Sequence, residues 1–343
     1  MKAFVKDFEQ RKRDHMELAL NPAHEAVGLS GLEQITLPHE AIPNCQFDEI
    51  DIYTYRFGKK VPSPFIVSSM TAGHPDALQF NARLMEACEE MGWTMGVGSQ
   101  RRELSEPEAI AEWAELRQQF PNAILLGNLG ATQLIDTPLS EVERLVDNLE
   151  AVGMIIHCNP LQECLQPEGT PDFQGAFDAI AALAENLTVP VIVKETGCGF
   201  SKSTLERLMS TSIAAVDVSG LGGTHWGRIE GARAFHDPIR QQAAQTFKNW
   251  GINTVDSLKQ AVSLTPNYEI WGSGGVRNGL DAAKLLYLGA STIGFAKPLL
   301  QAAQESTEAV VTFMQTIEYE LKVALFCTGH TTIEALQESA PRG

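Results

Sequence analysis

From about residue 62 onward, short apolar runs alternate with amphipathic stretches. The runs are rich in β-branched and other apolar residues, and they cover residues 65–70, 93–99, 123–129, 152–158, 190–195, 213–219, 268–273 and 291–296. Near-continuous hydrophobicity is typical of parallel strands that are buried on both faces. The intervening stretches have helical periodicity, and they predict helices over 76–91, 106–119, 139–151, 173–186 and 280–288.

Eight strand-then-helix units predict an α/β fold, namely a single (β/α)8 TIM barrel. A doubly wound open sheet is the alternative, although it rarely needs eight regular units. Residues 1–62 are expected to form an N-terminal arm or cap, and residues 63–343 the barrel. Residues 220–267 form a long insertion after strand six, and above the catalytic face such an insertion is a candidate lid. Ser203 is expected to cap a helix over 204–210, and Asn278 the helix that starts at Gly279.

Composition narrows the function. The chain has 343 residues, of which 44% are apolar and 20% charged, as in ordinary globular proteins. Its net charge of −17 disfavours nucleic-acid binding, and an anionic ligand would need a local cluster of cations or N–H groups. No apolar run is long enough for a membrane span. Six scattered cysteines without a CxxC pair, and a charged start with no leader-like stretch, predict reduced thiols and a cytoplasmic location.

Polar residues follow all eight predicted strands. In TIM barrels the catalytic groups come from the carboxyl ends of the strands, so these residues are expected to converge on one mouth. The most specific pair is Ser273-Gly274-Gly275-Val276-Arg277 and Gly294-Phe295-Ala296. Glycines let backbone N–H groups approach an anion, and barrels frequently bind phosphate after strands seven and eight. The two segments therefore predict a phosphate-bearing cofactor, with ordinary glycine turns as the alternative. Rossmann and Walker glycine motifs are not found.

Lys194 ends an otherwise apolar strand, where it could pair with a carboxylate or stabilise negative charge on a reduced flavin. His157, Asn159, Gln162 and Glu163 fall within seven residues, in an expected loop over the mouth. Glu163 could bind Mg²⁺ or be a solvated loop acid. A zinc site of His157, Cys158, Cys164 and Cys198 lacks supporting ligand spacing. The cluster Arg11-Lys12-Arg13-Asp14-His15 is either a charged helix turn or an arm that brings cations to a diphosphate.

Together these segments resemble the type 2 isopentenyl diphosphate isomerases, over residues 11–298. The discriminating motifs are Arg11-Lys12-x-x-His15 and His157-x-Asn159-Pro160-Leu161-Gln162-Glu163, since the glycine loops are shared with other FMN barrels. The remaining matches are Ser69-Met70-Thr71-x-Gly73, Gly98-Ser99-Gln100-Arg101, Gly127-Asn128-Leu129-Gly130, Lys194-Glu195, Asp217-Val218-x-Gly220-x-Gly222-Gly223-Thr224 and Ser273-Gly274-Gly275-Val276-Arg277. Two departures are Ala72, where the family usually has a second glycine, and His225, which puts the packing of the lid in doubt.

The resemblance implies that FMN contacts Ser69, Met70, Thr71, Ser99, Asn128, Lys194, Ser219, Thr224, Gly274, Gly275, Arg277, Ala296 and Lys297. It implies a substrate site of Arg11, Lys12, His15, Arg101, His157, Asn159 and Gln162, with Mg²⁺ on Glu163. The implied reaction interconverts isopentenyl and dimethylallyl diphosphate, with reduced FMN as acid and base and NADPH only as reductant. Gln162 would position the alkene, Lys194 would support the reduced flavin, and His157 would be a third catalytic residue. Homotetramers or homo-octamers are implied, and the N-terminal arm could reach a neighbouring subunit.

Two rival functions remain open. FMN α-hydroxy-acid oxidases share the fold and need a histidine base and an arginine, in a His-Gly-x-Arg arrangement after strand six. Here Thr224-His225-Trp226-Gly227-Arg228 has a similar composition in a different order. The second rival is a non-catalytic flavin- or phosphate-binding module. A protein that only binds such a ligand would not need polar residues at the ends of all eight strands, which disfavours this alternative.

Overall fold

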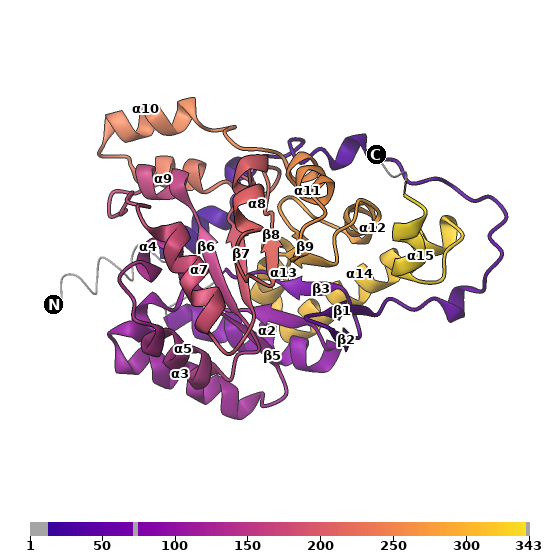
Figure 1. Cartoon of the computed structure of the whole chain (residues 1–343), viewed down its shortest axis with the longest axis horizontal. Coiled ribbons are helices and arrows are strands. Elements are labelled where there is room, and N and C mark those ends of the chain that lie inside the picture. Colours follow the sequence, from indigo (N-terminus) through magenta and orange to yellow (C-terminus); the bar gives the residue numbers. More distant parts are fainter. Residues whose placement is uncertain (1–12, 71–74, 341–343) are drawn as a thin grey trace.

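The predicted barrel is confirmed. In the computed structural model, which describes residues 13–70 and 75–340, eight parallel strands close on themselves (Figure 1). In barrel order they run from β3 to β10, and pairing of Ile293 in β10 with Phe65 in β3 closes the ring. Their bounds are β3 (Phe65–Val67), β4 (Thr94–Gly96), β5 (Ile124–Gly130), β6 (Met154–Cys158), β7 (Val191–Glu195), β8 (Ala215–Asp217), β9 (Glu269–Gly272) and β10 (Thr292–Phe295).

Burial on both faces explains the continuous apolar runs. In β6, Ile155 belongs to the cluster inside the barrel, whereas Met154 and Ile156 belong to the larger core between strands and helices. Side chains alternate along a strand, so both sides of this strand face apolar surroundings. The inner cluster consists of Ile66, Leu126, Ile155, Ile192, Ala215 and Trp271.

Helices surround the barrel (Figure 1). They include α2 (Pro75–Met91), α3 (Pro107–Gln119), α5 (Leu139–Leu149), α7 (Ala176–Asn186), α8 (Lys202–Leu208), α11 (Thr254–Ser263), α12 (Gly279–Tyr287), α13 (Lys297–Glu305), α14 (Thr307–Cys327) and α15 (Ile333–Glu338). The Asn278 side chain caps α12, as predicted, by accepting from the N–H of Asp281 at 2.8 Å. The prediction that Ser203 caps α8 is wrong. Ser201 does so, because it is the last extended residue and its side chain accepts from the N–H of Thr204 at 3.3 Å.

A hairpin closes the amino-terminal end of the barrel. It consists of β1 (Thr54–Arg56) and β2 (Lys59–Val61), which pair antiparallel. The Arg56 side chain is buried and donates to the Thr94 hydroxyl at 2.6 Å and the Thr292 hydroxyl at 3.4 Å, at the first residues of β4 and β10. The N–H of Phe57 donates to Oε1 of Glu269 at 2.6 Å. Polar and aromatic groups of the hairpin thus plug the bottom of the barrel.

The residues before the hairpin run from the mouth of the barrel to its bottom. A helix over 13–20 lies at the mouth, and the N–H of Ala26 then donates to the carbonyl of Gly223 at 2.8 Å. Further on, the N–H of Asp51 donates to the carbonyl of Thr331 at 2.9 Å. In the part of the chain described, no helix has the length and apolarity needed to cross a membrane.

The long insertion after strand six carries two helices before α11, namely α9 (Trp226–Arg233) and α10 (Pro238–Thr246). They pack on each other, and α10 lies at the outer margin of the molecule in Figure 1. Helix α9 also packs on α6 (Pro160–Leu165), which follows β6. The prediction of a loop after His157 is therefore wrong in part, because residues 160–165 form a helix. Pro160 stands at the first helical position, where a backbone N–H would have no partner within the helix and its absence is tolerated.

Candidate active site

A cavity of about 500 Å³ opens at the carboxyl ends of the strands. Residues at or just after the carboxyl end of every barrel strand line it, which confirms the expected convergence of polar strand ends. It is lined by Ser69, Met70, Ser99, Asn128, Lys194, Ser219, Thr224, Gly274, Gly275, Arg277, Ala296 and Lys297 of the expected FMN contacts, and by His15, Arg101, His157, Asn159, Gln162 and Glu163 of the expected substrate and metal contacts. Arg11, Lys12 and Thr71 lie outside the described residues, as do Ala72 and Gly73.

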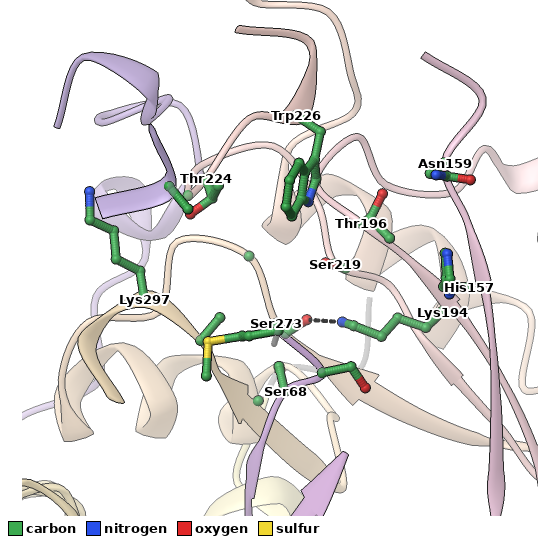
Figure 2. Close-up of a pocket in the computed structure, with 18 of the residues that line it drawn as sticks. Ser68, His157, Asn159, Lys194, Thr196, Ser219, Thr224, Trp226, Ser273 and Lys297 are labelled. Atoms are coloured by element: carbon green, nitrogen blue, oxygen red, sulfur yellow. Dashed lines mark hydrogen bonds between the residues drawn. The ribbon is translucent and has the colours of Figure 1, made fainter. Parts of the chain in front are cut away.

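Lys194 is the least exposed of the described Lys and Arg residues that line the cavity. The residue is 6% exposed, and its ammonium donates to Oδ2 of Asp217 at 2.5 Å. It also donates to the Ser273 hydroxyl at 3.1 Å, as Figure 2 shows. Ser273 in turn donates to Oδ1 of Asp217 at 2.7 Å. The first of the two alternatives, a pair with a carboxylate, is confirmed, and Lys194 also lines the cavity, while its role toward a flavin stays a prediction. The pair fixes the Lys194 ammonium in the cavity wall, and the Asp217 carboxylate balances its charge.

The orientation of His157 follows from its neighbour Asn128. The amide nitrogen of Asn128 donates to the carbonyl of Val97 at 3.1 Å, so its oxygen is the atom that faces Nδ1 of His157 at 2.9 Å. Nδ1 must then carry a proton in the neutral ring, which leaves Nε2 as the acceptor. The backbone N–H of Asn128 is held by Oε1 of Gln100 at 3.0 Å. Gln100 and Asn128 thus fix the ring of His157.

The glycine loops after β8 and β9 touch backbone to backbone. A Cβ on Gly274 would lie 2.2 Å from the carbonyl oxygen of Gly220, and one on Gly275 would lie 2.5 Å from that of Gly222. Both glycines have positive φ, at +98° and +75°. Within the described residues, no backbone carbonyl accepts from the N–H of either one. Close approach and available N–H groups are what a phosphate site requires.

A Gly274→Ala substitution is expected to weaken FMN binding by at least about tenfold, since overpacking against backbone costs about 1–3 kcal/mol. Titration of the apoprotein with FMN, followed by flavin fluorescence, measures this. Gly58→Ala is the matched control, because Gly58 also has positive φ, at +73°, but its Cβ would meet nothing within 4 Å. Unchanged FMN affinity in Gly274→Ala would contradict a phosphate site at this loop.

The side-chain charges at this end of the cavity are already paired. Lys297 is bonded to Oε1 of Glu25, and Arg277 donates to Oδ2 of Asp281 at 3.0 Å. Glu33 lies 3.5 Å from the same guanidinium. A phosphate here would therefore depend on backbone N–H groups more than on unpaired cations. Sequence reasoning missed Glu25, which lines the cavity from the N-terminal segment.

Glu230 of α9 is a second residue that the sequence did not reveal. It is fully buried, and its Oε1 accepts from Nε2 of Gln162 at 3.0 Å and faces Nε2 of His15 at 2.8 Å. Arg233 donates to the other oxygen at 2.6 Å. Burial opposes ionisation, but the hydrogen bond and charge of His15, with those of Arg233 and Gln162, bring the pKa of Glu230 below its usual value. This carboxylate fixes both Gln162 and His15.

Glu163 is not the solvated loop acid considered above, because it lies in α6 and is 9% exposed. Its Oε1 accepts from the amide of Asn159 at 3.1 Å and its Oε2 from the N–H of Thr170 at 2.7 Å. Among the residues described, no three His, Cys, Asp or Glu side chains gather as a metal-binding group. A single carboxylate fits Mg²⁺, which usually keeps several waters and binds substrate phosphates.

His225 caps α9 and does not line the cavity. Its Nδ1 accepts from the N–H of Arg228 at 3.3 Å, and its Nε2 faces the carbonyl of Trp250 at 3.1 Å. Burial lowers its pKa, so the ring is neutral with the proton on Nε2. The Arg228 guanidinium donates to the backbone carbonyls of Glu25 and Lys248. This departure from the family pattern therefore anchors the insertion, and neither residue is placed to act as the base or arginine of an oxidase.

Comparisons with known proteins show which family this chain belongs to. A family model described as FMN-dependent dehydrogenase matches residues 160–342. The isopentenyl-diphosphate delta-isomerase of Legionella pneumophila (strain Corby) is 61% identical over 333 residues, covering 97% of each chain. That of Bdellovibrio bacteriovorus is 51% identical over 334 residues, covering 96% of each.

Among solved structures, a mandelate oxidase variant has a TM-score of 0.66 at 16% identity, covering 95% of this chain and 94% of its own. A lactate oxidase from Pediococcus acidilactici has a TM-score of 0.66 at 15% identity, covering 97% of this chain and 92% of its own. These two share the fold alone. Because the isomerase relatives match nearly the whole chain at far higher identity, the chain belongs to the type 2, FMN-dependent isopentenyl-diphosphate delta-isomerases.

Proposed function

We propose that this protein interconverts isopentenyl diphosphate and dimethylallyl diphosphate, with reduced FMN as cofactor and Mg²⁺ on Glu163. The observation that carries the proposal is that Gln162, His157 and Asn159 share one cavity with Lys194 and with the glycine loops. The first three residues belong to the motif that distinguishes this family, and the others belong to the flavin end.

The residues present fit FMN. The hydroxyls of Ser68 and Ser69 are buried at the cavity and find no partner among the described residues, so a polar ligand would satisfy them. The glycine loops can receive a phosphate, and Lys194 supplies a buried positive charge for an electron-rich ring. When bound in its reduced form, FMN would supply the proton donor and acceptor that an unactivated alkene requires. NADPH would serve only to reduce it.

The diphosphate is assigned to the outer, polar side of the cavity. Arg101 lines it with an exposed side chain, and among the described residues no carboxylate pairs with its guanidinium. His157, Asn159 and His15 are further ligands, and Arg11 and Lys12 would join them from the segment before residue 13. Mg²⁺ on Glu163 would complete the charge balance in a chain whose net charge is −17.

Gln162 is proposed to position the alkene. A Gln162→Ala variant is expected to lose turnover by about 10- to 100-fold, because misplacing the substrate by about 1 Å can cost 100-fold. FMN should remain bound, since Gln162 is held by Glu230 and not by the glycine loops. Steady-state kinetics with an FMN titration test this, and loss of FMN from the variant would show that the assignment of Gln162 is wrong.

We further propose a homotetramer or homo-octamer in the cytoplasm. Residues 1–62 would act as an arm and cap, and residues 63–343 as the FMN-binding barrel.

The direct test is an anaerobic incubation with isopentenyl diphosphate, FMN and Mg²⁺, with and without NADPH, and with a chelator arm. Dimethylallyl diphosphate that forms only when the flavin is reduced and Mg²⁺ is present would support every part of the proposal. No product from reducible, FMN-loaded protein would refute it. Oxidation of lactate or glycolate would then revive the oxidase reading.

A further inference from the structure

Glu195 follows Lys194 at the end of β7, and the two side chains point to opposite sides of the strand. Lys194 lines the main cavity, whereas Glu195 lines a second, smaller one of about 10 Å³ beside it. That volume is roughly one water molecule. The small cavity is also lined by Asn159, Leu161, Gln162, Thr196, Cys198, Trp226 and Gly227. Glu195 therefore lies directly behind the proposed substrate side of the site.

One oxygen of Glu195 organises the loop that follows it. The side chain is 4% exposed, and its Oε2 accepts from the backbone N–H groups of Thr196 and Gly197 at 2.7 Å each, and of Gly199 at 3.0 Å. The N–H of Cys198 donates to the same atom. Four donors on one acceptor bend residues 196–199 tightly around the carboxylate. Thr196 and Gly197 are thereby turned into the wall of the main cavity, and Thr196 lies between Trp226 and Asn159 in Figure 2.

The surroundings of Glu195 are otherwise uncharged. Across the ladder its neighbour in β6 is Cys158, and the loop contributes Cys198. Burial, with the nearby Glu195 charge, raises the pKa of both thiols, so both are neutral. The α6 and α9 residues around the small cavity are not titratable. Burial also raises the pKa of Glu195 to about 7, although the four N–H groups oppose that shift.

We propose that Glu195 is a positioning residue for the substrate: through Oε2 it gathers the N–H groups of residues 196–199 and so holds Thr196 and Gly197 as the wall that faces Gln162 and Trp226. This inference rests on the proposed isomerase function. Glu195 itself does not touch the main cavity, so its effect on catalysis passes through the loop.

The test compares Glu195→Met, which keeps the length but loses the acceptor, with Glu195→Gln, which keeps one acceptor oxygen. The N–H groups of Thr196, Gly197 and Cys198 would lose their partner, whereas that of Gly199 also donates to the carbonyl of Ser219 at 3.3 Å. Three unsatisfied groups would force the loop to open, since each costs about 1–3 kcal/mol. The Met variant is expected to raise the KM for isopentenyl diphosphate by at least about tenfold. FMN affinity should stay within about threefold of wild type, and the Gln variant should restore most of the KM. Glu206→Gln, an exposed acid on α8, is the control.

The pH dependence gives a readout that a purely structural role would not change. Because the pKa of Glu195 is higher in the closed loop than in an open, solvated one, protonation favours the closed wall. The wild-type KM should therefore rise relative to that of Glu195→Gln as the pH increases from about 4.5, the ordinary pKa of a glutamate, to about 7, the raised pKa of Glu195, and should level off above that. Taking the ratio of the two KM values removes pH effects that the two enzymes share, including the titration of the substrate. This comparison also stands if the Met variant does not fold.

An unchanged KM in Glu195→Met would overturn the inference. A KM that rises only together with lost FMN affinity and a lower melting temperature, and is not restored by Gln, would do the same. So would a KM ratio of wild type to Gln variant that is flat with pH. These outcomes require an active wild-type enzyme, whereas inactive wild type would refute the proposed function instead.

Discussion

Replacing Lys194 with methionine is expected to lower turnover by about 100- to 1,000-fold, the usual effect of removing one pre-organised electrostatic group. Its ammonium is buried in the cavity wall and is fixed by Asp217 and Ser273. A reduced flavin carries more negative charge than an oxidised one, so the cation should stabilise the reduced form. The midpoint potential of bound FMN should accordingly become more negative in the variant.

The same substitution should also destabilise the fold by about 3–5 kcal/mol, because Asp217 would be left buried without its cation. The two effects can be separated with a double variant, Lys194→Met with Asp217→Asn, which is neutral at both positions. We expect it to recover much of the stability but not the turnover or the flavin potential. Urea unfolding, steady-state kinetics and a flavin redox titration are the measurements. Recovered turnover in the double variant would show that Lys194 has only a structural role.

The second large effect is expected at the bottom of the barrel. An Arg56→Met variant should lose about 3–5 kcal/mol of stability, since Arg56 is 4% exposed and is the counter-charge of Glu269. Its loss would also leave the hydroxyls of Thr94 and Thr292 without their donor. Burial lowers the pKa of Arg56 to about 10, opposed by Glu269, so the guanidinium is still charged at neutral pH.

Turnover per folded molecule should stay within about twofold of wild type in this variant, because the plug lies at the opposite end of the strands from the site. Denaturant unfolding and kcat measured below the unfolding transition check both parts. Lys59→Met, on the exposed side of the same hairpin, is the control and should be nearly neutral. Equal stability of the two variants would contradict the plug.

The barrel and the outline of its site could be predicted because both depend on local sequence. A strand that is apolar on both faces, such as β7 with Val191, Ile192 and Val193, reads as one continuous run. The polar residue that ends each run then has to face the mouth. Lys194, Asn128 and Gly274 were located by this rule alone, although their roles toward FMN rest on resemblance and remain proposals.

What sequence reasoning missed depends on contacts between distant residues. Glu230 is matched to His15 across 215 positions, and Glu25 to Lys297 across 272. The plug hairpin has strands of three residues with the charged pair Lys59 and Lys60, so it lacks any apolar alternation. Its importance appears only once Arg56 is seen beneath the barrel. The neighbouring polar residues Ser201 and Ser203 could each cap α8, and the local sequence does not choose between them.

The plug also determines from which end of the barrel cofactor and substrate can enter. With the bottom of the barrel sealed by Arg56 and Phe57, cofactor and substrate would both reach Lys194 through the mouth, which residues 13–20 and Trp226 border within the described part of the chain. Molecules that share one doorway must leave in the reverse of their order of entry. The flavin, which would lie against the strand ends, would then enter first and leave last. Saturating substrate should therefore slow the escape of FMN, so that a diluted enzyme retains its cofactor for as long as it has isoprenoid diphosphate to work on.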